Sequence, residues 1–404
     1  RNKVPNSTDK GNAIRNVPHL RFPEFDGEWK ECKLSDLCTF FSGGTPSSSN
    51  KDFYGGDIAF IRSGELHADS TELFITQVGF ESSSAKMVEV GDLLLAMYGA
   101  TSGDIAISKI EGAINQAILC IKTKYNKKFI ESVWNKHVSR ILRKYLQGGQ
   151  GNLSADIVKG ISFSFPTLTE QERIANFMSL LDERIATQNK IIDRLQTLIK
   201  GLNDSLYIQY GDEVLTSFAN LGTSYSGLSG KSAQDFGSGK PFITYLNVYS
   251  NNIINEKDFQ FVVIKDGEKQ NVVEYGDVLF TLSSETPEEV GIGSVYLGKK
   301  NVYLNSFCFG VHITNTEVAF SPYLSYYVSS TPFRKFIYPY AQGSTRFNLC
   351  KADFEKASIK LPSLENQKRI YSILKHIDNK IETEKSLLGL YNSQKQYLLR
   401  HMFI

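Results

Sequence analysis

The feature that most constrains the fold of this 404-residue chain is a long internal repeat. The stretch FPTLTEQERI, which begins at Phe165, recurs 196 positions later as LPSLENQKRI, which begins at Leu361. The same spacing continues without a gap as far as Leu202 and Leu398. A repeat of this length indicates two diverged copies of one unit, each a globular part followed by a helix.

Each copy ends in a segment whose apolar residues are spaced as in a coiled coil. A proline stops the preceding strand, and Thr169 and Ser363 are the expected helix N-caps. The apolar stripe runs for nearly five heptads without proline, and one position is polar in both copies, as register-fixing positions are. We expect helices of about 37 residues, each about 55 Å long. The alternative is that each helix packs only on its own domain. The stripe comprises Ile174, Leu181, Ile185, Gln188, Ile192, Leu195 and Leu202, then Ile370, Ile377, Ile381, Glu384, Leu388, Tyr391 and Leu398.

The remaining sequence predicts mixed α/β (α+β) domains. Short β-rich runs (residues 57–61, 92–98 and 117–121) alternate with Gly/Ser/Thr loops, and helical segments are expected at about 128–146 and 322–338. The second copy is rich in aromatic residues, most of which we expect in the core. The predicted divisions are a polar, flexible leader (1–16), a first domain (17–166), a first helix (167–210), a second domain (211–362) and a second helix (363–404). If the helices pack together they must be antiparallel, with a pseudo-twofold axis between two similar domains.

Composition restricts the class of partner. The net charge is only +2, so a nucleic-acid surface would have to be a local patch. The five cysteines include no CxxC pair, which favours free thiols in a reducing cytosol over disulfides or a zinc site. No apolar run approaches the roughly 20 residues of a membrane helix, and the polar leader does not resemble a signal peptide.

Motifs for catalysis are also missing. The chain has no Asn-Pro or Asp-Pro dipeptide, which an adenine methyltransferase motif would require. Gly230-Lys231-Ser232 is a fragment of a phosphate-binding loop, but position 225 is Tyr instead of the leading glycine. The six histidines form no HExxH motif. We therefore expect no catalytic residue and no metal site in this chain.

Several motifs, in this order, resemble the specificity subunits of type I restriction–modification enzymes. They are VPHLRFPEF from Val17, the GGTP turn from Gly43, and the Pro-x-Leu-x-x-Gln-x-x-Ile opening of both helices. The resemblance covers about residues 17–404, but the second copy has SGKS from Ser229 in place of the GGTP turn. It implies that each domain recognises one half of a split double-stranded DNA sequence. It also implies an antiparallel coiled coil that sets the spacing and binds two modification (methyltransferase) subunits.

The same resemblance assigns the chemistry to partner subunits in the cytoplasm. S-adenosylmethionine would be bound by the modification subunits, and ATP and Mg by restriction subunits that translocate and cleave DNA, with no cofactor on this chain. The alternative function is a coiled-coil scaffold that binds only protein. A scaffold would explain the helices but not two diverged domains with long polar loops, and it would lack salt-dependent DNA binding.

Base recognition requires hydrogen-bond donors and acceptors in loops that reach base edges, with Lys and Arg nearby for phosphates. Arg346 is the first candidate for a base contact, because arginine to guanine is the commonest specific pairing. Arg334 and Lys335 are further candidates for phosphate contacts. The predicted DNA-binding residues are Gly43, Gly44, Thr45, Ser47, Arg62, Tyr98, Thr101, Ser102, Arg143, Lys144, Gln150 and Asn152 in the first copy, and Lys231, Ser283, Ser284, Thr286, Gln342, Ser344, Thr345, Arg346 and Asn348 in the second.

Overall fold

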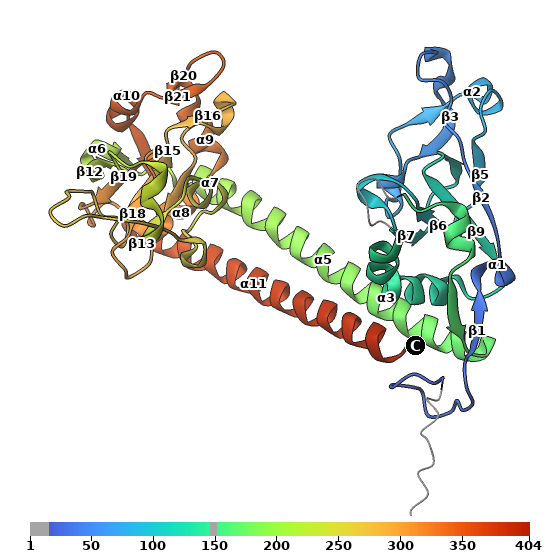
Figure 1. Cartoon of the computed structure of the whole chain (residues 1–404). Helices are drawn as coiled ribbons and strands as arrows, with labels where there is room; N and C mark the ends of the chain where they lie inside the picture. The colour runs from blue at the N-terminus through green and yellow to red at the C-terminus, as the bar shows by residue number, and fades with distance from the viewer. Residues whose placement is uncertain (1–15, 146–151) are drawn as a thin grey trace, which may run out of the picture. The chain divides into compact units, whose positions relative to one another are not determined.

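A computed structural model of the chain describes residues 16–145 and 152–404. The chain forms two compact units, one of residues up to Asn189 together with Leu387–Ile404, the other of Lys190–Ser386. Each unit contains one globular domain and parts of both long helices (Figure 1). We call the globular parts domain one (residues 16–166) and domain two (residues 211–362). The expected flexibility of the leader concerns residues that lie almost entirely outside the described ranges.

Both domains are built on the same four-stranded antiparallel sheet. Its order is β2-β9-β6-β7 in domain one and β12-β19-β15-β17 in domain two. Every residue of β6 and of β15 is buried, as in a central strand covered on both faces. The strands are β2 (Cys38–Ser42), β6 (Leu93–Ala96), β7 (Ile105–Ile107), β9 (Ile118–Thr123), β12 (Gly222–Ser226), β15 (Val278–Thr281), β17 (Gly293–Val295) and β19 (Cys308–Ile313).

A second sheet is shared in the same way. Its order is β4-β3-β8-β5 in domain one and β14-β13-β18 in domain two, and the long strand has a bulge in both. A two-stranded sheet, β1-β10 or β11-β22, leads into each long helix. The strands are β1 (Lys30–Lys33), β3 (Tyr54–Ile61), β4 (Phe74–Ile75), β5 (Lys86–Val88), β8 (Gly112–Ile114), β10 (Ser162–Phe165), β11 (Val214–Thr216), β13 (Phe236–Ile243), β14 (Gln260–Val262), β18 (Tyr303–Leu304) and β22 (Ile359–Leu361).

The helices that cover the sheets differ between the copies. Domain one has one continuous helix, α3 (Lys127–Tyr145), which confirms the expected helical segment. Domain two has two short helices, α8 (Ser321–Tyr327) and α9 (Thr331–Ile337), because Pro332 occupies the start of α9 and cannot continue α8. The remaining short helices are α1 (Leu34–Leu37), α2 (Gln77–Glu81), α4 (Ala155–Lys159), α6 (Phe218–Leu221), α7 (Tyr245–Ser250) and α10 (Lys351–Lys356).

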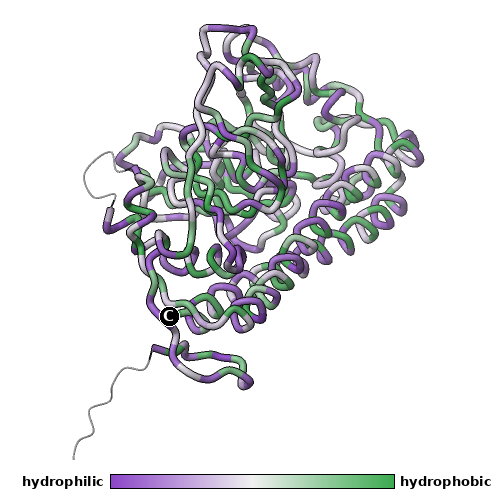
Figure 2. The backbone as a smooth tube through the Cα atoms, turned by 90° about the vertical axis from the view of Figure 1, so that its right-hand side faces the viewer, coloured by the Kyte–Doolittle hydropathy of each residue, from purple (hydrophilic) through white to green (hydrophobic). Residues whose placement is uncertain are grey.

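The two long helices are α5 (Leu168–Tyr210, 43 residues) and α11 (Leu364–His401, 38 residues). All fourteen predicted stripe positions are buried or half-buried. In the first unit Leu398 of α11 shares a core with Ile174 of α5, and in the second unit Ile370 shares a core with Leu202. The start of each helix therefore packs beside the end of the other, which is an antiparallel pairing, and the single-domain packing alternative is wrong. Hydrophobic and hydrophilic positions alternate along both helices (Figure 2).

The shared Pro-x-Leu-x-x-Gln motif builds the start of each long helix. The N-cap of α5 is Thr167, whose Oγ1 accepts from the Glu170 amide at 3.4 Å, so the prediction of Thr169 as the cap was wrong by two residues. Ser363 lies at the cap of α11, as predicted, although its hydrogen bond is long at 3.5 Å. The Gln side chain then donates back to the proline carbonyl in both copies, from Gln171 at 3.0 Å and from Gln367 at 2.9 Å.

The segment that follows the leader is fastened to the same helix start. The Arg21 guanidinium donates to both carboxylate oxygens of Glu170, at 2.8 and 2.7 Å, and the Trp29 indole also donates to Glu170. The Glu170 side chain is almost fully buried, and a buried carboxylate requires such a partner. The VPHLRFPEF motif is therefore part of the framework of domain one. Among the described residues no helix is both long and apolar enough to cross a bilayer.

Candidate DNA-recognition surfaces

A small three-stranded sheet on domain two brings together two of the predicted loops. It consists of β16 (Ser283–Ser284), β21 (Phe347–Leu349) and β20 (Ala341–Gln342), in that order. Asn348 pairs with Ser283 on one side and with Gln342 on the other. The 283–286 and 342–348 loops, predicted separately, therefore form one surface. The repeat did not reveal this pairing.

The hairpin between β20 and β21 carries the predicted base-contacting arginine. Gly343 has φ +138°, and a Cβ at this position would lie 2.1 Å from the Arg346 carbonyl oxygen, so the turn requires glycine. Ser344, Thr345 and Arg346 are all exposed at its tip. Gly343 thus allows a tight turn that presents Arg346 on the surface of domain two.

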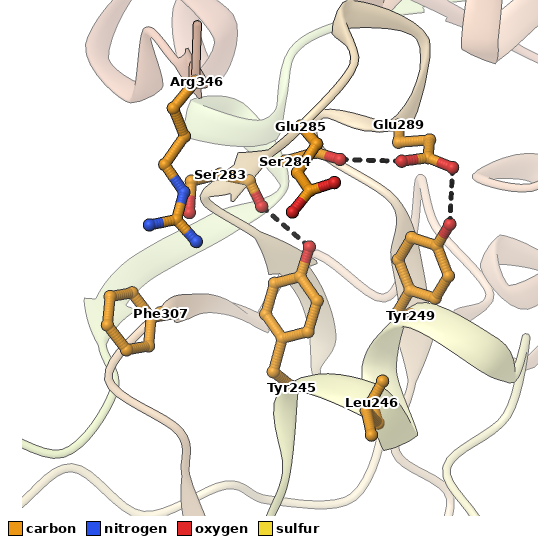
Figure 3. A pocket seen from close by; sticks show the side chains of 9 residues that line it. All are labelled: Tyr245, Leu246, Tyr249, Ser283, Ser284, Glu285, Glu289, Phe307 and Arg346. Atoms are coloured by element: carbon orange, nitrogen blue, oxygen red, sulfur yellow. Dashed lines mark hydrogen bonds between the residues drawn. The ribbon is translucent and has the colours of Figure 1, made fainter.

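Arg346 lies over a cavity of about 310 Å³ (Figure 3). Hydrogen bonds fix its wall: the Tyr245 hydroxyl donates to the Ser283 carbonyl at 2.7 Å, and the Tyr249 hydroxyl donates to Glu289 at 2.7 Å. The bond from Tyr249, followed by one from Ser284, lowers the pKa of Glu289. The other lining residues are Leu246, Glu285 and Phe307.

These aromatic residues are where the sequence-based expectation of core packing fails. Most aromatic residues of the second copy were expected in the core, and Tyr296 and Phe309 are fully buried, but the Phe307 side chain is 59% exposed at the rim of the cavity. Tyr245 and Tyr249 are half-buried and form its wall. The signal available in the sequence was their position beside predicted polar loops, since composition alone does not separate core from cavity aromatics.

The corresponding loop of domain one is a short turn after β6. The Leu153 amide donates to the Met97 carbonyl at 3.0 Å, and the Leu349 amide of domain two makes the equivalent bond to Leu282 at 2.8 Å. Exposed Asn152 therefore lies next to the turn that contains half-buried Tyr98, Thr101 and Ser102. The Ser102 hydroxyl donates to the Met97 carbonyl. Gln150 lies outside the described residues.

The two glycines of the GGTP turn are required by close packing of the backbone and not by contact with DNA. Gly43 and Gly44 are buried, and a Cβ on Gly43 would lie 1.8 Å from the Ile114 carbonyl oxygen. Gly227 holds the equivalent place in domain two, where a Cβ would lie 2.0 Å from the Asn305 carbonyl. These glycines permit close passage of one strand end beside another and offer no surface to DNA. Thr45 and Ser47 are exposed and remain candidates; the Thr45 hydroxyl donates to Gln116.

Two of the candidate cations are already neutralised or satisfied inside domain two. Lys231 donates to the Val263 carbonyl at 2.6 Å and to the Glu268 carboxylate. The bond from Lys231 to Glu268 is the main reason that the pKa of Glu268 is lowered to about 2. Arg334 donates to three backbone carbonyls, each at 2.7 Å, and burial lowers its pKa. Both side chains hold loops together, which argues against the predicted phosphate contacts.

The other candidate cations face solvent. Arg62 is exposed but forms an ion pair with Glu65 at 2.7 Å. The hydrogen bond from Arg62 is the main reason that the pKa of Glu65 is lowered. Arg143 and Lys144 are exposed in the last turn of α3. Lys335 is exposed on α9. Of the predicted hydroxyl residues near β16, Thr286 is exposed, Ser283 is half-buried and Ser284 is buried. Among the described residues no cluster of His, Cys, Asp and Glu could hold a metal ion.

A sequence model described as type I restriction modification DNA specificity domain matches this chain twice, at residues 26–197 and 228–389. The chain belongs to this family. Each match covers most of one domain and extends into the long helix that follows it, which confirms the two-copy organisation of this specificity subunit.

Two relatives are similar to this chain over most of its length. The specificity subunit is 24% identical to the putative type I restriction enzyme MjaX specificity subunit of Methanocaldococcus jannaschii, over 92% of this chain and 91% of that protein. It is 22% identical to the MjaVIII specificity subunit of the same organism, over 93% and 91%.

Solved structures share the fold. The S subunit of the type I restriction–modification system from M. genitalium superposes with a TM-score of 0.56 at 15% identity, covering 96% of this chain and 99% of that one. A chain from a study of complex assembly in the type I R-M system superposes with a TM-score of 0.59 at 16% identity, covering 95% and 98%. The predicted fold of two mixed α/β domains with two long helices is confirmed.

Proposed function

We propose that this specificity subunit recognises a bipartite double-stranded DNA target, one half with each domain. The observation that carries the proposal is that the two domains share the main four-stranded sheet strand for strand but differ in the loops at their surface. Base edges are recognised by such surface side chains, so two domains with different loops would recognise two different half-sites. Exposed Arg346, Ser344 and Thr345 in domain two, and Asn152 beside the Tyr98 turn in domain one, supply donors and acceptors.

The long helices would set the distance between the half-sites and bind two modification subunits. Several apolar side chains on their outer faces are exposed, which suits a protein partner. Restriction subunits would join this assembly, and S-adenosylmethionine, ATP and Mg would be held by the partners. The specificity subunit would contribute no catalytic group, and its five free cysteines suit work in the cytoplasm. The exposed apolar residues are Leu168, Leu180, Ile191, Leu198 and Ile208 of α5 and Ile373, Leu390 and Tyr397 of α11.

The experiment reconstitutes the subunit with modification subunits and measures methylation of a DNA library with S-adenosylmethionine. We expect methylation of one bipartite sequence, and none when this chain is tested alone. Arg346→Ala should relax one position of the second half-site and leave the first half-site intact. Lys335→Ala is the matched control: it removes an exposed cation that was predicted to contact a phosphate and not a base, so both half-site sequences should stay unchanged.

Two outcomes would contradict the proposal. Methylation by the isolated chain would make it an enzyme, against the non-catalytic role. A complex whose DNA binding shows no salt dependence and no sequence preference would favour the alternative of a protein-binding scaffold.

A further inference from the structure

Two opposite charges line the cavity of domain two without neutralising each other. Among the described residues, neither the Arg346 guanidinium nor the Glu285 carboxylate makes a hydrogen bond or an ion pair. Two other cations predicted for domain two are already bound within the protein, Lys231 to Glu268 and Arg334 to three backbone carbonyls. Arg346 and Glu285 therefore keep their full hydrogen-bonding capacity while they share one cavity (Figure 3).

The rest of the cavity restricts what can bind between them. Glu289 is a second carboxylate in the wall, so the cavity disfavours a phosphate, whereas the guanidinium disfavours a metal cation. Leu246 and Phe307, 69% and 59% exposed, flank the opening with apolar surface that would exclude water from a bound group. The cavity thus suits a flat, neutral group with acceptors at one end and a donor at the other.

We propose that this cavity recognises a single G·C base pair by its major-groove edge. Guanine presents two acceptors, O6 and N7, which match the two-pronged guanidinium of Arg346. Cytosine presents its N4 amino group, a donor that matches the carboxylate of Glu285. The two side chains together contact both bases of one pair. This assignment rests on the proposed function and extends it by adding Glu285 and the identity of the base pair.

The geometry of the wall supports this use of Glu285. Glu289 accepts from Tyr249 and Ser284, so both of its oxygens are occupied and it acts as fixed wall. Ser283, which pairs with Asn348 of the hairpin, receives the Tyr245 hydroxyl on its carbonyl. These contacts fix the strand before Glu285 relative to the hairpin of Arg346, which is what recognition of one base pair by two side chains requires.

The test uses the complete complex with its modification subunits and a library randomised at every position of the target. Arg346→Ala and Glu285→Gln are compared with Glu288→Gln, which removes the same charge three residues away from a side chain outside the cavity. We expect both cavity variants to relax the same position, G·C in the unmodified complex, each by on the order of tenfold or more. Glu288→Gln should leave this position unchanged.

Two further variants sharpen the result. Arg346→Lys retains the charge but not the two-pronged donor, so it should also relax the position if Arg346 contacts guanine, and leave specificity unchanged if Arg346 contacts a phosphate. The proposal is overturned if Glu285→Gln changes nothing, if the two cavity variants relax different positions, or if the shared position is not G·C. Failure of the proposed function would look different, because the unmodified complex would then methylate no defined bipartite sequence.

Discussion

Domain one and domain two place an aspartate at the same point of the main sheet but surround it with different chemistry. Asp92 and Asp277 each precede the central strand, are 2% exposed, and accept a backbone amide of the same turn at 3.0 and 2.9 Å. In domain one the carboxylate is paired with Lys122 at 2.5 Å. In domain two the partners are the Tyr225 hydroxyl at 2.7 Å and the His312 ring at 2.9 Å.

The difference shows in the pKa values. Burial alone would raise the pKa of Asp92, but hydrogen bonds from Lys122, the Glu89 amide and Lys127 together lower it. For Asp277 burial is the largest influence and raises the pKa, despite the bonds from the Glu274 amide, Tyr225 and His312. In both domains the aspartate accepts a hydrogen bond from a backbone amide of the turn before the central strand. The side chains that stabilise the buried carboxylate differ, since they are lysines in domain one and a tyrosine and a histidine in domain two.

The surfaces diverge in the same manner. Domain two has the hairpin sheet β16-β21-β20 and the cavity beneath Arg346, and its covering helix is broken at Pro332. Domain one has the unbroken α3 and a turn of three residues after β6. The framework and the recognition surface can therefore vary independently.

The largest effect should come from lengthening the framework alone. The two units divide the helices between Asn189 and Lys190 and between Ser386 and Leu387. One heptad inserted at each place leaves every contact within a unit intact and adds roughly 10 Å. At about 3.4 Å per base pair this is on the order of three more unread base pairs. Methylome sequencing of cells with the lengthened subunit should show the new spacing, unchanged half-sites and loss of the original target.

A lengthened subunit that still methylates the original spacing would show that the helices do not set the distance. The matched control is a substitution of seven existing residues at the same places by the inserted heptad. That control should retain the original target, because the length is unchanged.

The next largest effect should distinguish the two aspartates. Asp92→Asn leaves Lys122 and Lys127 without their buried counter-charge and should lower the free energy of unfolding by about 3 kcal/mol. This value is at the lower end of the range for a broken buried ion pair, because both lysines are partly exposed. Asp277→Asn keeps an acceptor for the Glu274 amide and for Tyr225 and should cost less than about 1 kcal/mol. Hydrogen exchange of β6 and of β15 amides measures each domain separately. Equal costs would mean that the two environments are equivalent.

The sequence predicted the framework well, because the framework has a periodic signature. The repeat and the heptads predicted α5 and α11 nearly to the residue. The cap of α5 was misplaced, since Thr167 and Thr169 have equal propensity and only the backbone geometry chooses between them.

The candidate site was predicted only in part, because its chemistry depends on tertiary pairing. Nothing local distinguishes Lys231, which pairs with Glu268, from a cation that faces solvent. The buried glycines Gly43 and Gly44 have the composition of a flexible loop. Glu285 became a candidate only when the β16–β21 pairing placed it on the same cavity as Arg346.

A smaller effect should separate the two helix-start glutamines. Gln367 is fully buried and makes three hydrogen bonds, to the Val318 and Pro362 carbonyls and from the Phe320 amide. Gln171 makes one, to Pro166, and its Oε1 has no partner. Gln367→Leu should therefore cost about 2 kcal/mol of unfolding free energy and Gln171→Leu at most about 1. Chemical denaturation with domain-resolved hydrogen exchange tests this, and a larger cost for Gln171→Leu would reverse the comparison.

The smallest effect is a pH dependence of opposite sign in the two domains. The pKa of Asp277 is raised on folding, so its contribution to stability is full below the ordinary aspartate pKa and is lost as pH rises through the raised value. The pKa of Asp92 is lowered, so its contribution is full above the ordinary value and is lost as pH falls through the lowered value. As pH falls from 7 toward the ordinary aspartate value, domain two should gain stability relative to domain one, measured as opening free energies from hydrogen exchange. Asp277→Asn removes the titrating group and should abolish that gain, whereas Glu274→Gln, a change of charge on the neighbouring exposed turn, should preserve it. A gain that survives Asp277→Asn would assign the pH dependence to other groups, and the two buried aspartates would then differ in their partners but not in their titration.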